Sequence, residues 1–155
     1  MRKLLAAALA LGLALSPAPA PAQDKPAGVH RTEILNRAAL ERLRRNSGLS
    51  LQWISWDNSR GRVRLEEQDG LFHLRGSQQQ RNGPGRLEMD GVVTRIDATS
   101  FIFQGRVAMR QAPENRAECL REGQLHFRVT GTRRYWRMQE MEACAGLTDY
   151  VDIYF

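Results

Sequence analysis

Four polar side chains on a predicted β-hairpin are the residues whose types and spacing best suit binding chemistry. Two alternating segments flank the turn sequence Thr130-Gly131-Thr132. A chain reversal there places Arg128 opposite Tyr135 and His126 opposite Arg137, all on one face of the hairpin. Arginine presents a planar fork of hydrogen-bond donors that matches a carboxylate or a phosphate. The row therefore predicts a site for an anionic ligand or an acidic protein surface. A solvated strand face without a ligand is the alternative.

The other face of this hairpin is apolar and ends in the two cysteines of the chain. The same register pairs Phe127 with Trp136, Leu125 with Met138 and Cys119 with Cys144. A disulfide between the cysteines would close the open end of the hairpin, and an exported chain meets conditions that favour it. A loop of this length would stabilise the fold by about 3–4 kcal/mol.

Five aromatic side chains at apolar positions form a second candidate site. They are Trp53, Phe101, Phe103, Phe127 and Trp136. At the mouth of a small barrel such rings could line a pocket for a small apolar ligand. The alternative, which the size of the side chains favours, is a filled core.

Catalytic and metal-binding patterns do not emerge from the sequence. The three histidines are His30, His73 and His126, and none has a second ligand at the spacing of a metal site. Nucleophile elbows and phosphate loops are missing, and Asp149 and Asp152 would lie on opposite faces of a strand. The sequence therefore predicts a protein that is not an enzyme and holds no cofactor or metal.

The first 22 residues have the pattern of an export signal. Arg2 and Lys3 precede an apolar run over residues 4–15, and an Ala-x-Ala sequence ends at Ala22. The run is shorter than the about 20 residues that span a bilayer. We therefore expect a signal peptide over 1–22, cleavage near Ala22, and a mature chain without a transmembrane helix in the periplasm or secreted.

The net charge is positive, but the basic residues are interspersed with acidic ones. The chain has a net charge of +6, which falls to +4 when Arg2 and Lys3 leave with the signal peptide. Arginines are scattered and mixed with acids along predicted strands, as in Arg62–Glu67. This pattern is typical of a solvated strand face and gives no strong nucleic-acid signal.

A short helix is expected after a flexible leader over residues 23–31. Residues 33–46 repeat apolar side chains at helical spacing, with Thr32 as the predicted N-cap and Gly48 as the stop. Its apolar stripe comprises Ile34, Leu35, Ala39, Leu40 and Leu43. The stripe predicts packing against a larger unit, and binding to a membrane surface is the alternative.

From Leu49 to the end of the chain the apolar period is two, which is typical of β-strands. Turn sequences divide residues 49–155 into about eight strands, one of them Leu71–Gln79, with the longest connection over 111–122. Glycines at 91 and 105 on apolar faces suit a sharply coiled sheet. One domain over 32–155 is thus predicted: a mainly β, up-and-down antiparallel barrel with one short N-terminal α-helix. A β-sandwich is the alternative.

The end of the chain allows a further interpretation. Val151, Ile153 and the terminal Phe155 alternate, as in the closing strand of outer-membrane β-barrels. A small outer-membrane barrel or an envelope structural protein is therefore the alternative to an exported binding module.

Two resemblances accompany these patterns. Residues 135–141, Cys144 and 149–155 resemble the C-terminal region of uncharacterised exported proteins of proteobacteria, and no activity comes with this likeness. The succession of strands and turns over residues 49–76 is similar to calycin-type barrels such as lipocalins and avidins. That similarity implies an architecture, and it carries over no ligand site.

Overall fold

The computed structural model of the protein describes residues 28, 30–55, 59–114 and 116–155. The predicted signal peptide, its cleavage site and most of the predicted leader lie outside these residues. Among the described residues, no helix is long and apolar enough to cross a membrane.

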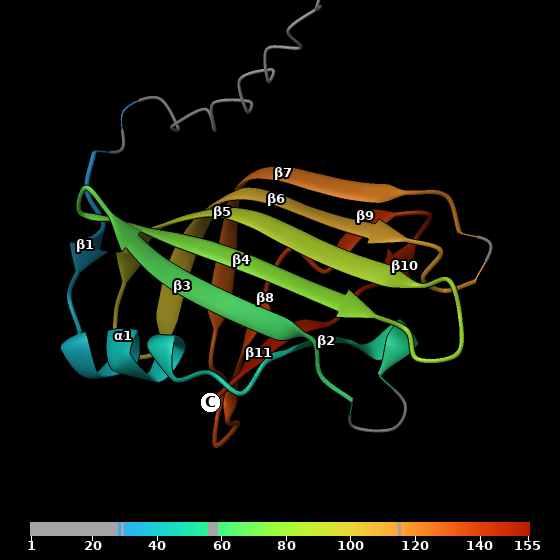
Figure 1. The fold of residues 1–155 in the computed structure, drawn as a ribbon, viewed down its shortest axis with the longest axis horizontal. Helices are drawn as coiled ribbons and strands as arrows, with labels where there is room; N and C mark the ends of the chain where they lie inside the picture. The colour runs from blue at the N-terminus through green and yellow to red at the C-terminus, as the bar shows by residue number, and fades with distance from the viewer. Residues whose placement is uncertain (1–27, 29, 56–58, 115) are drawn as a thin grey trace, which may run out of the picture.

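A single antiparallel sheet coils into a nearly closed barrel of eight strands, so the predicted barrel with one short helix is confirmed. The sheet order is β2-β11-β8-β7-β6-β5-β4-β3, and β1 adds to β5 in parallel. The elements are β1 (Glu33–Ile34), α1 (Arg37–Arg44), β2 (Leu49–Leu51), a 3₁₀ turn (Gln52–Ile54), β3 (Arg62–Gln68), β4 (Leu71–Gln79), β5 (Arg86–Ile96), β6 (Ser100–Arg110), β7 (Cys119–Arg128), β8 (Tyr135–Met138), β9 (Glu142–Cys144), β10 (Leu147–Thr148) and β11 (Val151–Tyr154). The β9–β10 hairpin lies at one end of the barrel and α1 with β1 at the other (Figure 1).

The barrel closes through a short seam between β2 and the start of β3. The backbone N–H groups of Leu49 and Gly61 each donate to the carbonyl of the other, at 3.3 and 2.8 Å. The buried Gln78 extends the seam because its side-chain oxygen accepts from Leu51 N at 2.8 Å and its amide donates to Ser59 O at 3.0 Å. The side chain of Gln78 thus bridges β2 and the segment before β3, in place of direct backbone hydrogen bonds between them.

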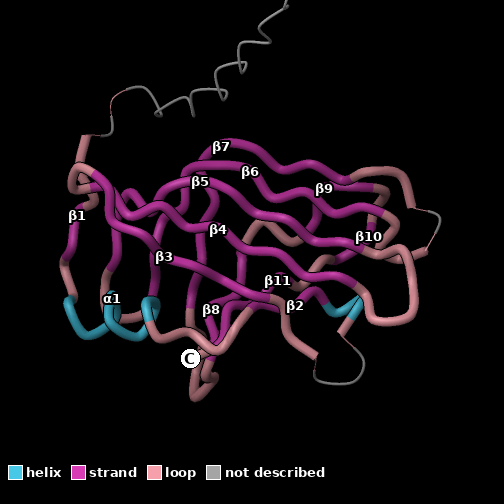
Figure 2. Tube along the Cα trace, in the orientation of Figure 1, coloured by secondary structure: helices cyan, strands magenta, loops and turns pink. Residues whose placement is uncertain are grey.

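Apolar side chains fill the inside of the barrel. Phe101 stacks on Phe127 at 4.7 Å between ring centroids, and Trp136 meets Phe101 edge-on at 5.8 Å. Val151 and Ile153 are fully buried, so the alternation that could have faced lipid faces this core. Strands form nearly all of the barrel wall, and α1 covers one end (Figure 2).

Two glycines in the barrel wall face each other. Gly91 of β5 and Gly105 of β6 are register partners. A Cβ on Gly91 would lie 2.4 Å from Gln104 O and 2.7 Å from Phe103 Cζ. The ring of Phe103 therefore occupies the space that a larger residue would need, and glycine allows the strands to coil there.

The helix is shorter than predicted. It begins after Asn36, whose side chain accepts from Ala39 N at 2.8 Å, so the predicted cap at Thr32 and the bounds 33–46 are wrong. Thr32 is buried and instead joins the sheet, donating to Val93 O and accepting from Phe72 N. Of the predicted stripe, the helix buries Ala39, Leu40 and Leu43, whereas Ile34 and Leu35 are exposed.

The register of the predicted hairpin is wrong by two residues. Phe127 pairs with Met138, not Trp136, and Arg128 pairs with Arg137. The shift arises because the inner ends of the two arms bond to neighbouring strands: Val129 N donates to Thr99 O, and the Arg134 carbonyl accepts from Phe155 N. A shift of two leaves every side chain on its predicted face.

The predicted connection over 111–122 is also shorter, because β7 already begins at Cys119 and pairs with β6 from Met109 onward. By contrast, the strand predicted over Leu71–Gln79 has those bounds in the structure. The turn at Asp69-Gly70 is also confirmed, since both residues have positive φ between β3 and β4.

Candidate functional site

All three tyrosines of the chain gather on the outside of the barrel over β8 and β11. Tyr135 and Arg137 occupy the outward positions of β8, and Asp152 and Tyr154 those of β11. Tyr150 stands just before β11 and is exposed. We call these five residues the tyrosine–arginine surface. They meet because Asp152 pairs with Arg137 and Tyr154 with Tyr135 across the two strands.

A bidentate ion pair forms the centre of the tyrosine–arginine surface. Arg137 donates through Nε and a terminal nitrogen to the two oxygens of Asp152, each at 2.7 Å. The hydrogen bonds that Arg137 donates to Asp152 outweigh partial burial and raise the pKa of Arg137, so the guanidinium stays charged. Its plane also lies 4.0 Å from the ring centroid of Tyr150 and 5.2 Å from that of Tyr135. These contacts hold two aromatic rings, a guanidinium and a carboxylate in one arrangement.

Three exposed arginines border this surface. Arg60 lies 3.8 Å above the ring of Tyr154, Arg133 lies 5.7 Å from the ring of Tyr135, and Arg128 is the register partner of Arg137. In the described part of the chain, none of the three pairs with a carboxylate. On the opposite wall, arginines do pair with acids, as Arg110 does with Glu88 at 2.8 Å. The surface is therefore positive as well as aromatic.

The predicted polar row is only partly reproduced. Arg128, Tyr135 and Arg137 lie together as predicted. His126 does not pair with Arg137, because the register shift makes Arg128 the partner of Arg137; the ring of His126 bonds to Glu140 at 2.7 Å instead, and its backbone N–H donates to the same carboxylate at 2.9 Å. Sequence reasoning missed Tyr150, Asp152 and Tyr154, although tyrosines at both arms of a predicted strand pair were a usable signal.

The predicted aromatic set divides in two. Phe101, Phe103, Phe127 and Trp136 are fully buried and contact one another in the core. Trp53 is only partly buried, and its indole N–H donates to Asp149 at 2.9 Å. Four of the five thus belong to the filled core, and the fifth belongs to another cluster.

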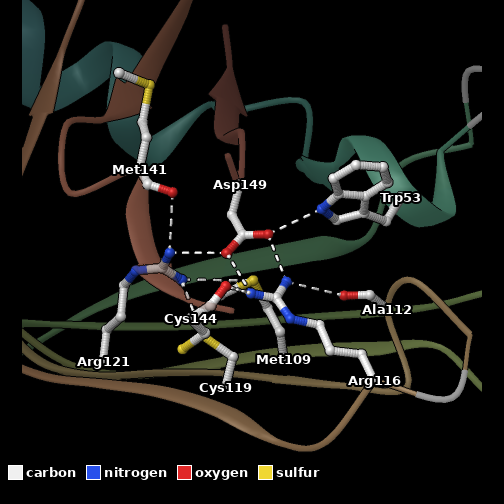
Figure 3. The surroundings of a disulfide bond; sticks show 9 residues. All are labelled: Trp53, Met109, Ala112, Arg116, Cys119, Arg121, Met141, Cys144 and Asp149. Atoms are coloured by element: carbon white, nitrogen blue, oxygen red, sulfur yellow. Dashed lines mark hydrogen bonds and ion pairs between the residues drawn. A yellow bond between two sulfur atoms is a disulfide. The ribbon is translucent and has the colours of Figure 1, made fainter. Parts of the chain in front are cut away.

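That cluster is a buried aspartate held by two buried arginines at the β9–β10 end of the barrel (Figure 3). The side chain of Asp149 is 0% exposed, that of Arg121 3% and that of Arg116 7%. Arg116 donates to both carboxylate oxygens, at 2.7 and 3.2 Å, and Arg121 donates to one at 2.8 Å. Two cations therefore share one anion inside the fold.

Hydrogen bonds decide the charge of Asp149. Burial alone would raise its pKa, but the bonds from Arg116, Arg121 and Trp53 outweigh burial and lower the pKa below its ordinary value. The carboxylate is therefore ionised at neutral pH. The sequence contained a signal for this cluster. Every second residue from Cys119 to Phe127 faces inward, and Arg121 is the charged residue among these inward positions. A buried arginine needs a partner of opposite charge.

The disulfide between Cys119 and Cys144 is confirmed, with Cα atoms 5.8 Å apart. It joins the start of β7 to β9, and it lies beside the buried ion cluster (Figure 3). Arg121 donates toward Cys119 Sγ at 3.6 Å, and Arg116 donates to the Cys144 carbonyl at 2.7 Å. The disulfide and the buried ion cluster are therefore in direct contact. Among the described residues, no group of three or more His, Cys, Asp or Glu side chains could hold a metal ion.

Comparison with known proteins places the chain in a family. The PM1083 family matches residues 31–155. The protein belongs to this family. A relative from Pasteurella multocida (strain Pm70), named "Uncharacterized protein PM1083", is 33% identical over 108 residues, which cover 68% of this chain and 69% of the relative. No solved structure matches the chain. The likeness to bacterial proteins is thereby supported, while the C-terminal signature and the likeness to calycin barrels stay predictions.

Proposed function

We propose that this member of the PM1083 family is an exported binding module whose tyrosine–arginine surface docks an acidic segment of a partner protein. The observation that carries the proposal is the gathering of all three tyrosines around Arg137, with three further arginines at the border. Tyrosine and arginine are enriched at the energetic centres of protein interfaces.

Charge favours an acidic occupant. Arg60, Arg128 and Arg133 are exposed and, among the described residues, have no carboxylate partner. Asp152, the carboxylate of the surface, is buried and already bound by Arg137. An incoming carboxylate would therefore meet arginines that pair with no carboxylate of the described residues at the border, and aromatic rings at the centre, whereas a cationic partner would be repelled.

The disulfide is compatible with an oxidising destination such as the periplasm, as the predicted signal peptide requires. A small outer-membrane barrel is the alternative. The inward direction of Val151 and Ile153 favours the binding module, because an outer-membrane strand would turn its apolar face to lipid.

Binding of a fluorescent poly-glutamate peptide to the full chain tests the proposal. Glutamine at positions 60, 128 and 133 removes the border charge and leaves the Arg137–Asp152 pair intact. Each exposed contact contributes about 0.5 kcal/mol. The triple variant is therefore expected to bind about tenfold more weakly, as measured by fluorescence anisotropy at low salt.

The matched control replaces the exposed Arg64, Arg86 and Arg106 by glutamine, which changes the net charge equally on strands β3, β5 and β6, away from β8 and β11. Equal weakening in both variants would mean that net charge alone attracts the peptide, and the proposal would fail. Binding of anionic lipid vesicles or heparin without binding of the peptide would also overturn it.

A further inference from the structure

The buried ion cluster contains more positive than negative charge. In the described part of the chain, Asp149 is the one carboxylate that pairs with Arg116 or Arg121. The Nε atoms of both arginines are buried without a hydrogen-bond partner there. An unbalanced buried cation is costly unless an anion can approach it.

Apart from Asp149, the contact of Arg121 that could become an anion is the sulfur of Cys119. Arg121 points a terminal nitrogen at Cys119 Sγ, 3.6 Å away, while its other terminal nitrogen bonds to Asp149. The two cysteines are not equivalent, because the residue Cys119 is 1% exposed whereas the residue Cys144 is only partly buried. An external reagent would thus reach Cys144, and Cys119 would be the sulfur beside the cation.

We propose that the Cys119–Cys144 disulfide is a site of thiol–disulfide exchange, at which an external thiolate attacks Cys144 and Arg121 holds Cys119 as the leaving thiolate. The attack forms a bond between the external sulfur and Cys144 Sγ. It breaks the Cys119–Cys144 bond, whose electron pair stays on Cys119 Sγ. A second thiol of the reagent then displaces Cys144, so that the reagent is oxidised to its disulfide and both cysteines are reduced.

Charge balance gives the reason for this direction of cleavage. A thiolate on Cys119 would supply the second anion that the two guanidiniums lack. A cation beside a thiol favours its ionised form, and a more stable thiolate leaves faster. Arg121 is therefore proposed as a positioning residue that lowers the barrier to exchange, independently of the tyrosine–arginine surface.

Two measurements on the full chain test this proposal. Limited reaction with glutathione, followed by acid quenching and mass spectrometry, is expected to find the mixed disulfide on Cys144. In the Cys144→Ala variant, the ultraviolet absorbance of the Cys119 thiolate is expected to titrate below the about pH 8.5 of a free cysteine. A mixed disulfide mainly on Cys119, or a thiolate that forms only at or above pH 8.5, would overturn the proposal.

Arg116→Gln is the matched control for Arg121→Gln. Both arginines are buried and bind Asp149, but in the described part of the chain only Arg121 contacts a sulfur. If each variant loosens the fold equally, any difference in the rate of reduction by dithiothreitol reports on that contact. We expect reduction of Arg121→Gln to be on the order of tenfold slower than that of Arg116→Gln, with partial rescue in Arg121→Lys. Reduction of Arg121→Gln as fast as the control, or faster, would refute the role of Arg121.

Discussion

Replacement of Asp149 by asparagine removes the one anion from the buried cluster and leaves its shape unchanged. The new side chain can still accept from Trp53 and Arg116 through its oxygen, but its amide would face guanidinium donors that previously met the second carboxylate oxygen. Removing one partner of a buried ion pair costs about 3–5 kcal/mol. Domains are stable by only about 5–15 kcal/mol. We therefore expect the midpoint of thermal unfolding to fall by roughly 10–20 °C.

Asp152→Asn is the matched control. Its carboxylate also binds an arginine in bidentate geometry, but the side chain of Arg137 is 17% exposed and can be hydrated when its partner is lost. We expect this variant to lose only about 1–3 kcal/mol. Urea unfolding at neutral pH, followed by tryptophan fluorescence with the disulfide intact, measures both free energies. An Asp149→Asn variant that loses no more stability than Asp152→Asn would refute the argument from buried charge.

A double variant distinguishes the loss of the ion pair from the cost of leaving a buried arginine without a partner. Arg121→Gln in the Asp149→Asn background removes one of the cations that the first change leaves unpaired. The double variant should therefore be more stable than the sum of the two single changes predicts. Additive losses would mean that the two side chains do not interact through their charges.

Acidity and the barrel seam give two further predictions. Because the folded pKa of Asp149 lies below its unfolded value of about 3.9, its contribution is complete above about pH 4 and is lost as the pH falls through the folded pKa. Urea unfolding between pH 7 and pH 2 should show a steeper acid loss in the wild type than in Asp149→Asn; equal slopes would contradict this. Gln78→Ala leaves the buried N–H of Leu51 without its acceptor and should cost about 1–3 kcal/mol. Hydrogen exchange at Leu51 should become faster while that at Leu49 changes less, and unchanged protection at Leu51 would show that Gln78 does not close the seam.

The sequence was sufficient for the barrel because binary patterning in a β-strand is local. The alternation of Val151 and Ile153 determines a strand and its apolar face, and the Asp69-Gly70 sequence determines a turn, without knowledge of the rest of the chain. Two cysteines in a chain expected to be exported also sufficed to predict their bond.

The strand register and the helix N-cap could be assigned only from the tertiary structure. Thr32 is a good N-cap by type, but hydrogen bonds to Val93 and Phe72 draw it into the sheet, and Asn36 caps the helix instead. The sequence at Gly131 predicted a turn, yet bonds from the two arms to Thr99, just before β6, and to Phe155, just after β11, accompany a pairing that is shifted by two residues. Competing partners distant in sequence decided both outcomes.

The candidate sites, too, were determined partly by the sequence and partly by the tertiary structure. By its own pattern the sequence determined which side of β8 carries Tyr135 and Arg137. Only the fold could bring Tyr150, Asp152 and Tyr154 to them, because neighbouring strands in a coiled sheet supply those side chains. Likewise an arginine at an inward position of β7 could be seen in the sequence. That it shares one aspartate with a second buried arginine beside the disulfide was decided by the meeting of two distant segments, 116–121 and 144–149, at the end of the barrel.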